Sequence, residues 1–459
     1  MSALVNNAAQ IAGLLVWVGL WTVGGWWLTL SAFNLRRNEL ALVGLTVGLV
    51  VETLLANGLA RLLPLPLAFW AAAGLTFALG LGLAASRDVR RLLRIPIVPA
   101  QWLALVFLTY VFTSIGRGLA LYDDYAHLPT LSLMATGDIP PHFSLDPSVP
   151  YGYHYFLMLF ATQIMRIADL LPWTALDFSR GLSFALAILL AGVWVRRLTH
   201  NAFAGFLGGV LAAFGMGTRW LLLLLPAGVV ASLGQNVQMI GSGLSSGPDL
   251  ATALISCWGI DGSGPIPFPF AFVNGIYGPG VLGFLGANGL IDTAVSFSIL
   301  LTFNRWRNWR GPAVTVLLVA ASGLLGETGL VLSLVSWSVL TVIYVWRNRR
   351  LRLPSSLRQW WLVLLAGNLL GVFQGGAWTD LIRGWIEGAQ ASYQTIGFAL
   401  HWTPAIVSAH LGVLSLLDPH QLLIALLEIG PILLVLPLVC VWGVKAFRAG
   451  RWYEAAIVI

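Results

Sequence analysis

Repeated apolar runs of about 18 residues or more constrain the fold of this chain more than any other feature. The chain has 459 residues, of which 58 % are hydrophobic and 9 % are charged, whereas soluble domains carry roughly 25 % charged residues. In a bilayer, helices satisfy their own backbone hydrogen bonds. We therefore expect an all-α, polytopic transmembrane helix bundle of about 11 to 13 spans, with external loops that carry short interfacial helices.

Five cationic clusters predict how the helices are oriented. Loops rich in Lys and Arg lie on the cytoplasmic side of a membrane, and the clusters hold seventeen of the twenty-five such residues. The N-terminus and the loop 121–151 then fall outside. Because these clusters account for the net charge of +7, we expect no nucleic-acid partner. We expect a multi-pass integral membrane protein, most simply of a bacterial cell membrane. The clusters are Arg36-Arg37, Arg87 to Arg94, Arg305 to Arg310, Arg347 to Arg358 and Lys445 to Arg451.

The spacing of the apolar runs divides the chain into four regions. A three-span N-terminal extension comes first, and a module with an acidic external loop follows it. A Gly/Pro-rich external loop and a set of C-terminal helices with a further external loop complete the chain. The regions are 1–99, 100–233 with the acidic loop at 121–151, 234–279, and 280–459 with the further loop at 378–421. The last residues resemble the beginning of another span, so we expect the natural protein to continue.

Three apolar stretches between two external loops leave the span count open, because an even number of crossings is required there. One solution makes Tyr153 to Leu171 a re-entrant or interfacial helix, which places Arg196-Arg197 in the cytoplasm. The other divides Ala202 to Leu233 at its Gly-rich centre. Further along, Pro312 to Trp346 has room for two short spans joined near Gly326.

The acidic loop is the main candidate for chemistry. It and the segment that follows it hold four of the eighteen acids and three of the seven histidines. If a short helix begins at Tyr122, His127 falls one turn from Asp123 and Asp124. Such a trio can supply a general base or hold a divalent cation through carboxylate oxygens. The alternative is a solvated cap on an interfacial helix.

Two further groups follow in the same loop. Asp138, His142 and Asp146 lie in a Pro-rich turn, where they serve as substrate contacts or only as polar turn residues. Tyr153 and His154 belong to the segment PYGYHYF, where the loop returns to the membrane. Aromatic residues there usually form an interfacial belt, but the same rings can stack on a sugar and His154 can bind phosphate.

Motifs for nucleotide or metal chemistry are missing from the sequence. It contains no Walker loop, Rossmann fingerprint, nucleophile elbow or Cys/His spacing typical of zinc. We therefore expect no metal site of the His/Cys type and no ATP-driven step. A divalent cation beside Asp123 and Asp124 is the one cofactor that the residues leave open.

From Leu103 to Gly215, the chain resembles the GT-C polytopic membrane glycosyltransferases, in particular the mannosyl- and aminoarabinosyl-transferase branches. The resemblance rests on an external loop that opens YDDYAH after a span, on PYGYHYFLMLFATQIMRI, and on the Arg-containing FSRGLSFALAILLAGVWVRRLTHNAFAGFLGGVLAAF. It implies transfer of a sugar from a polyprenyl-phosphate donor to an external acceptor.

The resemblance also implies roles for individual residues. Asp123 or Asp124 would be the catalytic carboxylate, and His127 and His154 would contact the donor phosphate. Arg180 would match the Arg that follows the second helix of the module in these enzymes. Two alternatives stay open. The chain can be a non-catalytic subunit of a larger membrane complex built on the same scaffold, or a secondary transporter with helices broken near Gly215 and Gly326.

Overall fold

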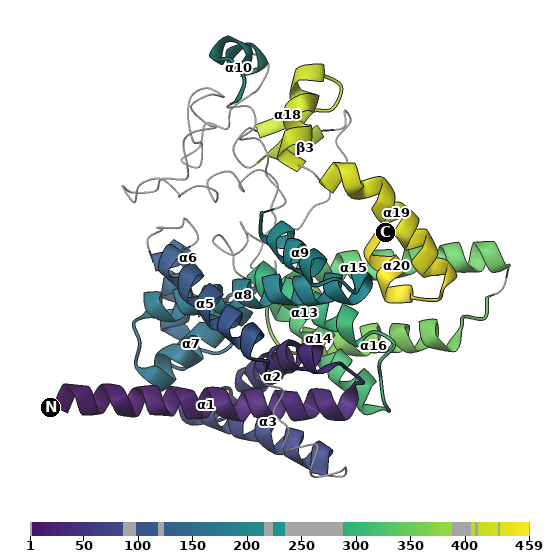
Figure 1. The fold of residues 1–459 in the computed structure, drawn as a ribbon. Helices are drawn as coiled ribbons and strands as arrows, with labels where there is room; N and C mark the ends of the chain where they lie inside the picture. Colours follow the sequence, from purple (N-terminus) through teal and green to yellow (C-terminus); the bar gives the residue numbers. More distant parts are fainter. Residues whose placement is uncertain are drawn as a thin grey trace.

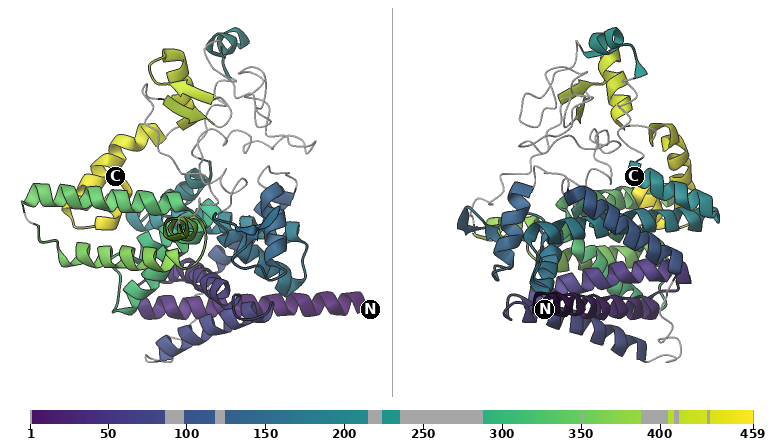
Figure 2. Two further views of the ribbon diagram at one scale, coloured as in Figure 1. Left: turned by 180° about the vertical axis from the view of Figure 1, so that it is seen from behind. Right: turned by 60° about the vertical axis from the view of Figure 1, so that its left-hand side comes forward.

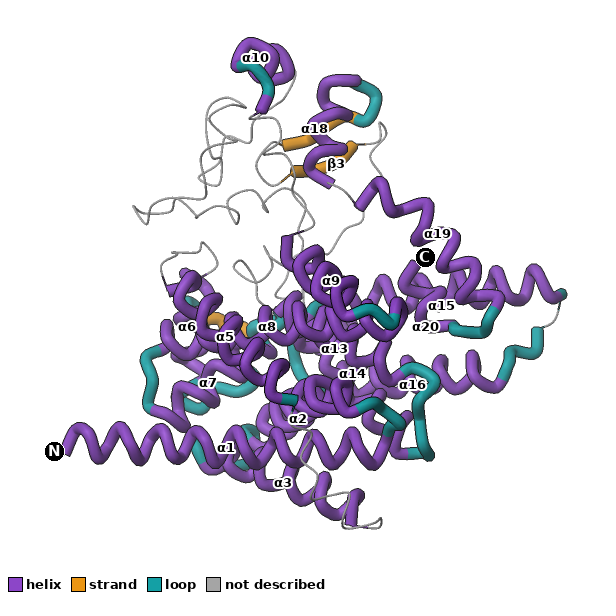
Figure 3. Tube along the Cα trace, in the orientation of Figure 1, coloured by secondary structure: helices purple, strands orange, loops and turns teal. Residues whose placement is uncertain are grey.

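The computed structural model describes residues 2–85, 98–117, 124–214, 224–234, 288–349, 351–387, 405–408, 412–429 and 432–458. These residues form helices almost throughout, with two short antiparallel hairpins (Figure 1, Figure 3). This confirms the expected all-α, polytopic helical bundle. The elements of the N-terminal half are α1 (Ser2–Ala32), α2 (Arg37–Leu59), α3 (Leu67–Ala85), α5 (Pro99–Arg117), α6 (Asp124–Met134), β1 (His142–Phe143), β2 (Asp146–Pro150), α7 (Phe156–Ala168), α8 (Pro172–Thr199), α9 (Ala202–Phe214) and α10 (Ala227–Gly234).

The second half of the chain continues the bundle. Its described elements are α13 (Asn288–Thr302), α14 (Arg310–Leu325), α15 (Glu327–Asn348), α16 (Ser355–Val372), α17 (Ala377–Glu387), β3 (Ala405–Ser408), β4 (Gly412–Ser415), α18 (Pro419–Ile429), α19 (Ile432–Arg448) and α20 (Trp452–Val458). Figures 1 and 2 show α10, and α18 with the β3–β4 hairpin, apart from the main bundle.

Within the described residues, five helices are long and apolar enough to cross a membrane: most of α1, α2, α3, α8 and most of α15. The number becomes six if α16 and α17, which meet at an angle of 75°, are counted as one broken span. Five shorter apolar helices lie among them. The total of about 11 to 13 spans stays a prediction.

Several cationic segments meet at one end of the bundle, which we call the basic end. Arg197 of α8 lies 3.4 Å from Glu39 of α2 and donates to the Leu301 carbonyl of α13 at 2.5 Å. Backbone bonds join Asn34 to Arg305 at 2.8 Å and Arg307 to Ala32 at 2.9 Å. The cationic segments that follow α1, α8 and α13 therefore lie together, as the same-side prediction requires.

The opposite end, which we call the site end, contains Asn57, Tyr155 and Gln374. Here α2, the start of α7 and the end of α16 meet through hydrogen bonds. Arg117, the last residue of α5, contacts Thr174 in the first turn of α8. The acidic loop connects α5 to α7 and α8, so it belongs to this end of the bundle.

Helix α7 bears on the uneven span count. It has 13 residues, so it is about 20 Å long, too short for a hydrocarbon core of about 30 Å. Helix α8 begins at the site end and carries Arg196 and Arg197 to the basic end. The re-entrant or interfacial alternative for Tyr153 to Leu171 thus fits, and Phe156 to Ile164 are buried within the bundle.

One other expectation can be compared with the described helices. The chain turns at Gly326 between α14 and α15, as predicted for two short spans, so Gly326 joins two helices and does not interrupt one. Near the C-terminus, α18 packs on the β3–β4 hairpin, and α19 follows as a separate helix. Gly215 lies outside the described residues.

Glycines allow α1 to pack closely on its neighbours. A Cβ on Gly25 would collide with the backbone of Gly44 and Gly48 in α2, and one on Gly48 would collide with the Trp21 carbonyl. Without a hydrophobic force between helices in lipid, such backbone contact is a main source of association. Helix α2 therefore lies inside the bundle, and 89 % of its most apolar 18-residue stretch is buried.

We predict that Gly48→Leu destabilises the bundle by about 3 kcal/mol, because the added side chain overpacks the α1–α2 contact. The unfolding midpoint of the purified protein in detergent measures this loss. Gly58→Leu on the same helix is the matched control, since a Cβ there meets no atom within 4 Å. Equal losses in both variants would contradict the packing argument.

Candidate functional site

A buried polar cluster lies where α6 packs against α8 at the site end. The Nη2 of Arg180 lies 3.3 Å from Nδ1 of His127, and its Nη1 lies 3.8 Å from Asp177 one turn earlier on α8. All three side chains are buried, with 6 % of His127, 3 % of Arg180 and 1 % of Asp177 exposed. The structure therefore brings together two residues that the sequence predicted, and adds a carboxylate.

The two predicted catalytic carboxylates, Asp123 and Asp124, precede His127 in the sequence by four and three residues. Asp124 is the first residue of α6, so the backbone places it one turn before His127. Its side chain, and all of Asp123, lie outside the described residues. The short helix expected from Tyr122 therefore begins at Asp124 as far as the structure describes it, and the catalytic role of both acids stays a prediction.

His127 is held as a neutral imidazole. Burial, reinforced by the positive charge of Arg180 and by His154, lowers its pKa from 6.5 to about 3. Arg180 has only donors, so Nδ1 of His127 accepts its hydrogen bond and the ring proton resides on Nε2. His127 thus offers a substrate a neutral donor, whereas the positive charge at this place comes from Arg180.

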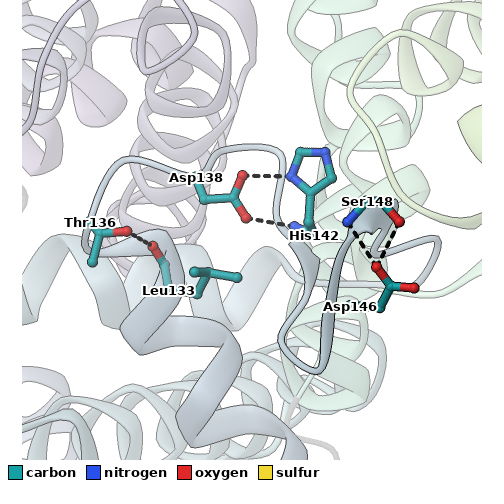
Figure 4. A network of polar contacts seen from close by, with 6 residues as sticks. All are labelled: Leu133, Thr136, Asp138, His142, Asp146 and Ser148. Atoms are coloured by element: carbon teal, nitrogen blue, oxygen red, sulfur yellow. Dashed lines mark hydrogen bonds and ion pairs between the residues drawn. The ribbon is translucent and has the colours of Figure 1, made fainter.

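The Pro-rich turn of the acidic loop folds as a β-hairpin and not as a short helix. Figure 4 shows the carboxylate of Asp138 accepting from the backbone N–H of His142 at 2.7 Å and contacting its Nδ1 at 2.6 Å. Asp146 accepts from the hydroxyl and backbone N–H of Ser148, and these bonds lower its pKa. His142 is therefore fixed by its own turn, with 41 % of its side chain exposed.

The aromatic segment leaves the hairpin and enters the bundle. Tyr153 and His154 have ring centroids 3.5 Å apart, and Tyr151 meets Tyr153 edge-on at 6.2 Å. His154 lies close enough to influence the pKa of His127. The next residue, Tyr155, is fully buried and its burial raises the pKa of the phenol. Tyr155 is therefore a core residue and not part of an interfacial belt.

Tyr155 belongs to a joint centred on the Gln374 carbonyl. The Nδ2 of Asn57 donates to this oxygen at 2.6 Å and the Tyr155 hydroxyl donates at 2.9 Å, while Arg61 is a third donor. Tyr155 also donates to Oδ1 of Asn57 at 2.9 Å. The following Gly375 has φ +114°, and a Cβ on it would collide with the Tyr155 hydroxyl. This turn therefore requires glycine.

Beside the joint, an open cleft of about 440 Å³ lies at the same end of the bundle. Its lining comes from the α2–α3 turn, the turn after α6, and Arg166 of α7. A larger cleft of about 710 Å³ lies at the basic end, between the α13–α14 turn and α16. Among the described residues, no group of three or more His, Cys, Asp or Glu side chains can hold a metal ion.

Comparison of the chain with models of known protein families, with curated proteins and with solved structures found no match.

Sequence reasoning missed several residues at this end, although some carried a signal. Asp177 precedes Arg180 by three residues, a spacing that places both on one face of a helix. Asn57 is a polar side chain within an apolar span, a position that usually marks function or specific pairing. No local pattern identifies Gln374, because its backbone carbonyl is what takes part.

We predict that acid destabilises the protein through His127. The unfolded chain takes up a proton near pH 6.5 but the folded chain only near pH 3, so stability is lost as the pH falls between these values. At pH 5 the loss from this group is about 2 kcal/mol. The midpoint of thermal unfolding in detergent at pH 7 and pH 5 measures it.

His127→Gln removes the titrating group and should reduce the drop between the two pH values. His142→Gln, at a half-exposed position of the same loop, is the control and should retain the wild-type drop. An unchanged drop in His127→Gln would show that other groups cause the acid sensitivity.

Proposed function

We propose that this protein is a membrane glycosyltransferase of the GT-C type, which transfers a sugar from a polyprenyl-phosphate donor to an acceptor outside the cell. One observation carries the proposal. Helix α6, which begins at Asp124, packs so that the ring of His127 contacts the guanidinium of Arg180. This contact lies at the end of an apolar bundle opposite the basic end. This arrangement places charge and hydrogen-bond donors where a lipid-linked phosphate and water can both be present.

The reaction would use the loop in two ways. Asp123 or Asp124, as a general base, takes the proton of the acceptor hydroxyl while the hydroxyl oxygen of the acceptor attacks the anomeric carbon of the sugar. The bond from that carbon to the phosphate oxygen breaks, and the phosphate leaves with the electron pair. Arg180 and the Nε2–H of His127 are suited to stabilise this negative charge, because buried donors act strongly at a site that excludes water.

The aromatic segment before α7 is consistent with such a substrate. Tyr153 and His154 are partly exposed and their rings lie against each other, just before α7 enters the bundle. Flat rings of this kind can stack on a sugar. A non-catalytic subunit with the same scaffold would retain the cluster but lack transfer, and the first experiment separates the two.

We predict that Asp123→Asn and Asp124→Asn differ from each other in transfer from a radiolabelled polyprenyl-phosphate sugar. The variant of the general base should lose about 100-fold or more of the rate, because its amide cannot accept the proton. Asp146→Asn is the matched control, since Asp146 is an exposed acid of the same loop. Full activity in both test variants would refute this mechanism, and absence of transfer in the wild type would favour the subunit.

We also predict that the site end faces outward. In a background with Cys257 and Cys440 replaced by Ser, Ser144→Cys in the hairpin should react with a membrane-impermeant maleimide on intact cells. Ser355→Cys, at the start of α16 near the basic end, should react only after the cells are permeabilised. Both positions are exposed in the protein. The reverse pattern would place the acidic loop in the cytoplasm and exclude an external acceptor.

A further inference from the structure

The cleft of about 440 Å³ at the site end is lined both by arginines and by leucines. Arg61 and Arg166 both line it, although they lie on different elements, at the end of α2 and in the last turn of α7. The other contributors are mainly the apolar residues of the α2–α3 turn. Two positive charges therefore border a cleft to which leucines of the α2–α3 turn also contribute.

The two guanidinium groups are available to a ligand. Arg61 donates through Nη2 to the Gln374 carbonyl and also bonds to the Tyr155 hydroxyl, and these bonds hold the side chain in place. None of the ion pairs within the described part of the chain includes Arg61 or Arg166. Asp169 follows Arg166 by one turn, but its Oδ2 accepts from Gln10 of α1 at 3.2 Å.

Exposed leucines in and near the cleft favour a lipid over a soluble anion. Leu62, which lines the cleft, is 80 % exposed, and Leu67, two residues after the lining residue Leu65, is 55 % exposed. A Cβ on Gly137, in the opposite wall, would meet no atom within 4 Å, so the cleft is open there. Exposed leucines at the end of a transmembrane helix lie where acyl chains meet headgroups, and arginines at that level bind lipid phosphate.

We infer that this cleft binds the phosphate group of an anionic membrane lipid, with Arg61 and Arg166 on the phosphate and the leucines of the α2–α3 turn against its hydrocarbon chain. Arg presents a planar fork of donors that matches phosphate oxygens. The inference goes beyond the proposed transfer, because the bound lipid need not carry a sugar or react. Binding alone tests it, independently of any enzymatic activity.

The experiment uses the full-length protein in neutral detergent, with dioleoyl phosphatidic acid as the probe and native mass spectrometry to count bound lipids. We expect Arg166→Gln to weaken binding about tenfold through the lost charged contacts, and Arg61→Gln to weaken it as well. Arg166→Gln is decisive, because Arg166 takes no part in the Gln374 joint. Arg358→Gln, an exposed arginine near the basic end, is the matched control and should bind as the wild type does.

Two competitors identify the ligand. Dioleoylglycerol has the same chains without the phosphate and should not bind in the cleft, while inorganic phosphate should not displace the lipid at equal concentration. Displacement by inorganic phosphate would mean a site for the free anion and would overturn the lipid assignment. Wild-type binding by Arg166→Gln, or an equal loss in Arg358→Gln, would overturn the site itself.

Discussion

The burial of α2 within the bundle is the constraint on which the rest of the structure depends. A helix surrounded by protein in a membrane must pair its polar side chains internally, because neither lipid nor neighbouring water can satisfy them. Helix α2 pairs them at both of its ends. Glu39 contacts Arg197 at the basic end, and Asn57 bonds to Tyr155 and Gln374 at the site end. Between them, buried Glu52 lies close to Gln163 of α7.

These polar contacts explain why the site end is so densely bonded. The N-terminal helices α1, α2 and α3 are not a separate appendage, because α2 supplies a partner both to the aromatic segment that follows the acidic loop and to the α16–α17 turn. The His127–Arg180 cluster and the Arg61–Arg166 cleft thus stand on the same framework.

Much of the fold could be predicted from the sequence, because bilayer thickness and charge asymmetry act on local segments. The three N-terminal helices and the turn at Gly326 follow from the lengths of apolar runs, and the clustering of arginines predicts which helix ends lie together. His127 was selected by its spacing from Asp123 and Asp124, and Arg180 only through a family resemblance. Their contact with each other was not predicted. The sequence left two alternatives open for the span count around α7. The short length of α7 fits the re-entrant or interfacial alternative, while the Gly-rich centre of Ala202 to Leu233 lies outside the described residues.

Other features could not be predicted, for a physical reason. The pairing of Glu39 with Arg197, or of Asn57 with Gln374, joins residues more than a hundred positions apart, and it depends on how helices rotate about their axes. The β-hairpins likewise depend on contacts within Pro-rich segments that carry no period. Asp123 and the side chain of Asp124, on which catalysis would depend, lie outside the described residues.

The Gln374 carbonyl has a geometric consequence for the whole bundle. Helices in lipid can slide along one another with little change in the surface that they bury, because apolar side chains are similar along the whole length of a span. A single oxygen that receives donors from Asn57, Arg61 and Tyr155 removes this freedom. A shift of one helix by one turn, about 5.4 Å, would break these bonds together. The oxygen therefore fixes the end of α2, the start of α7 and the α16–α17 turn at the same depth in the bundle.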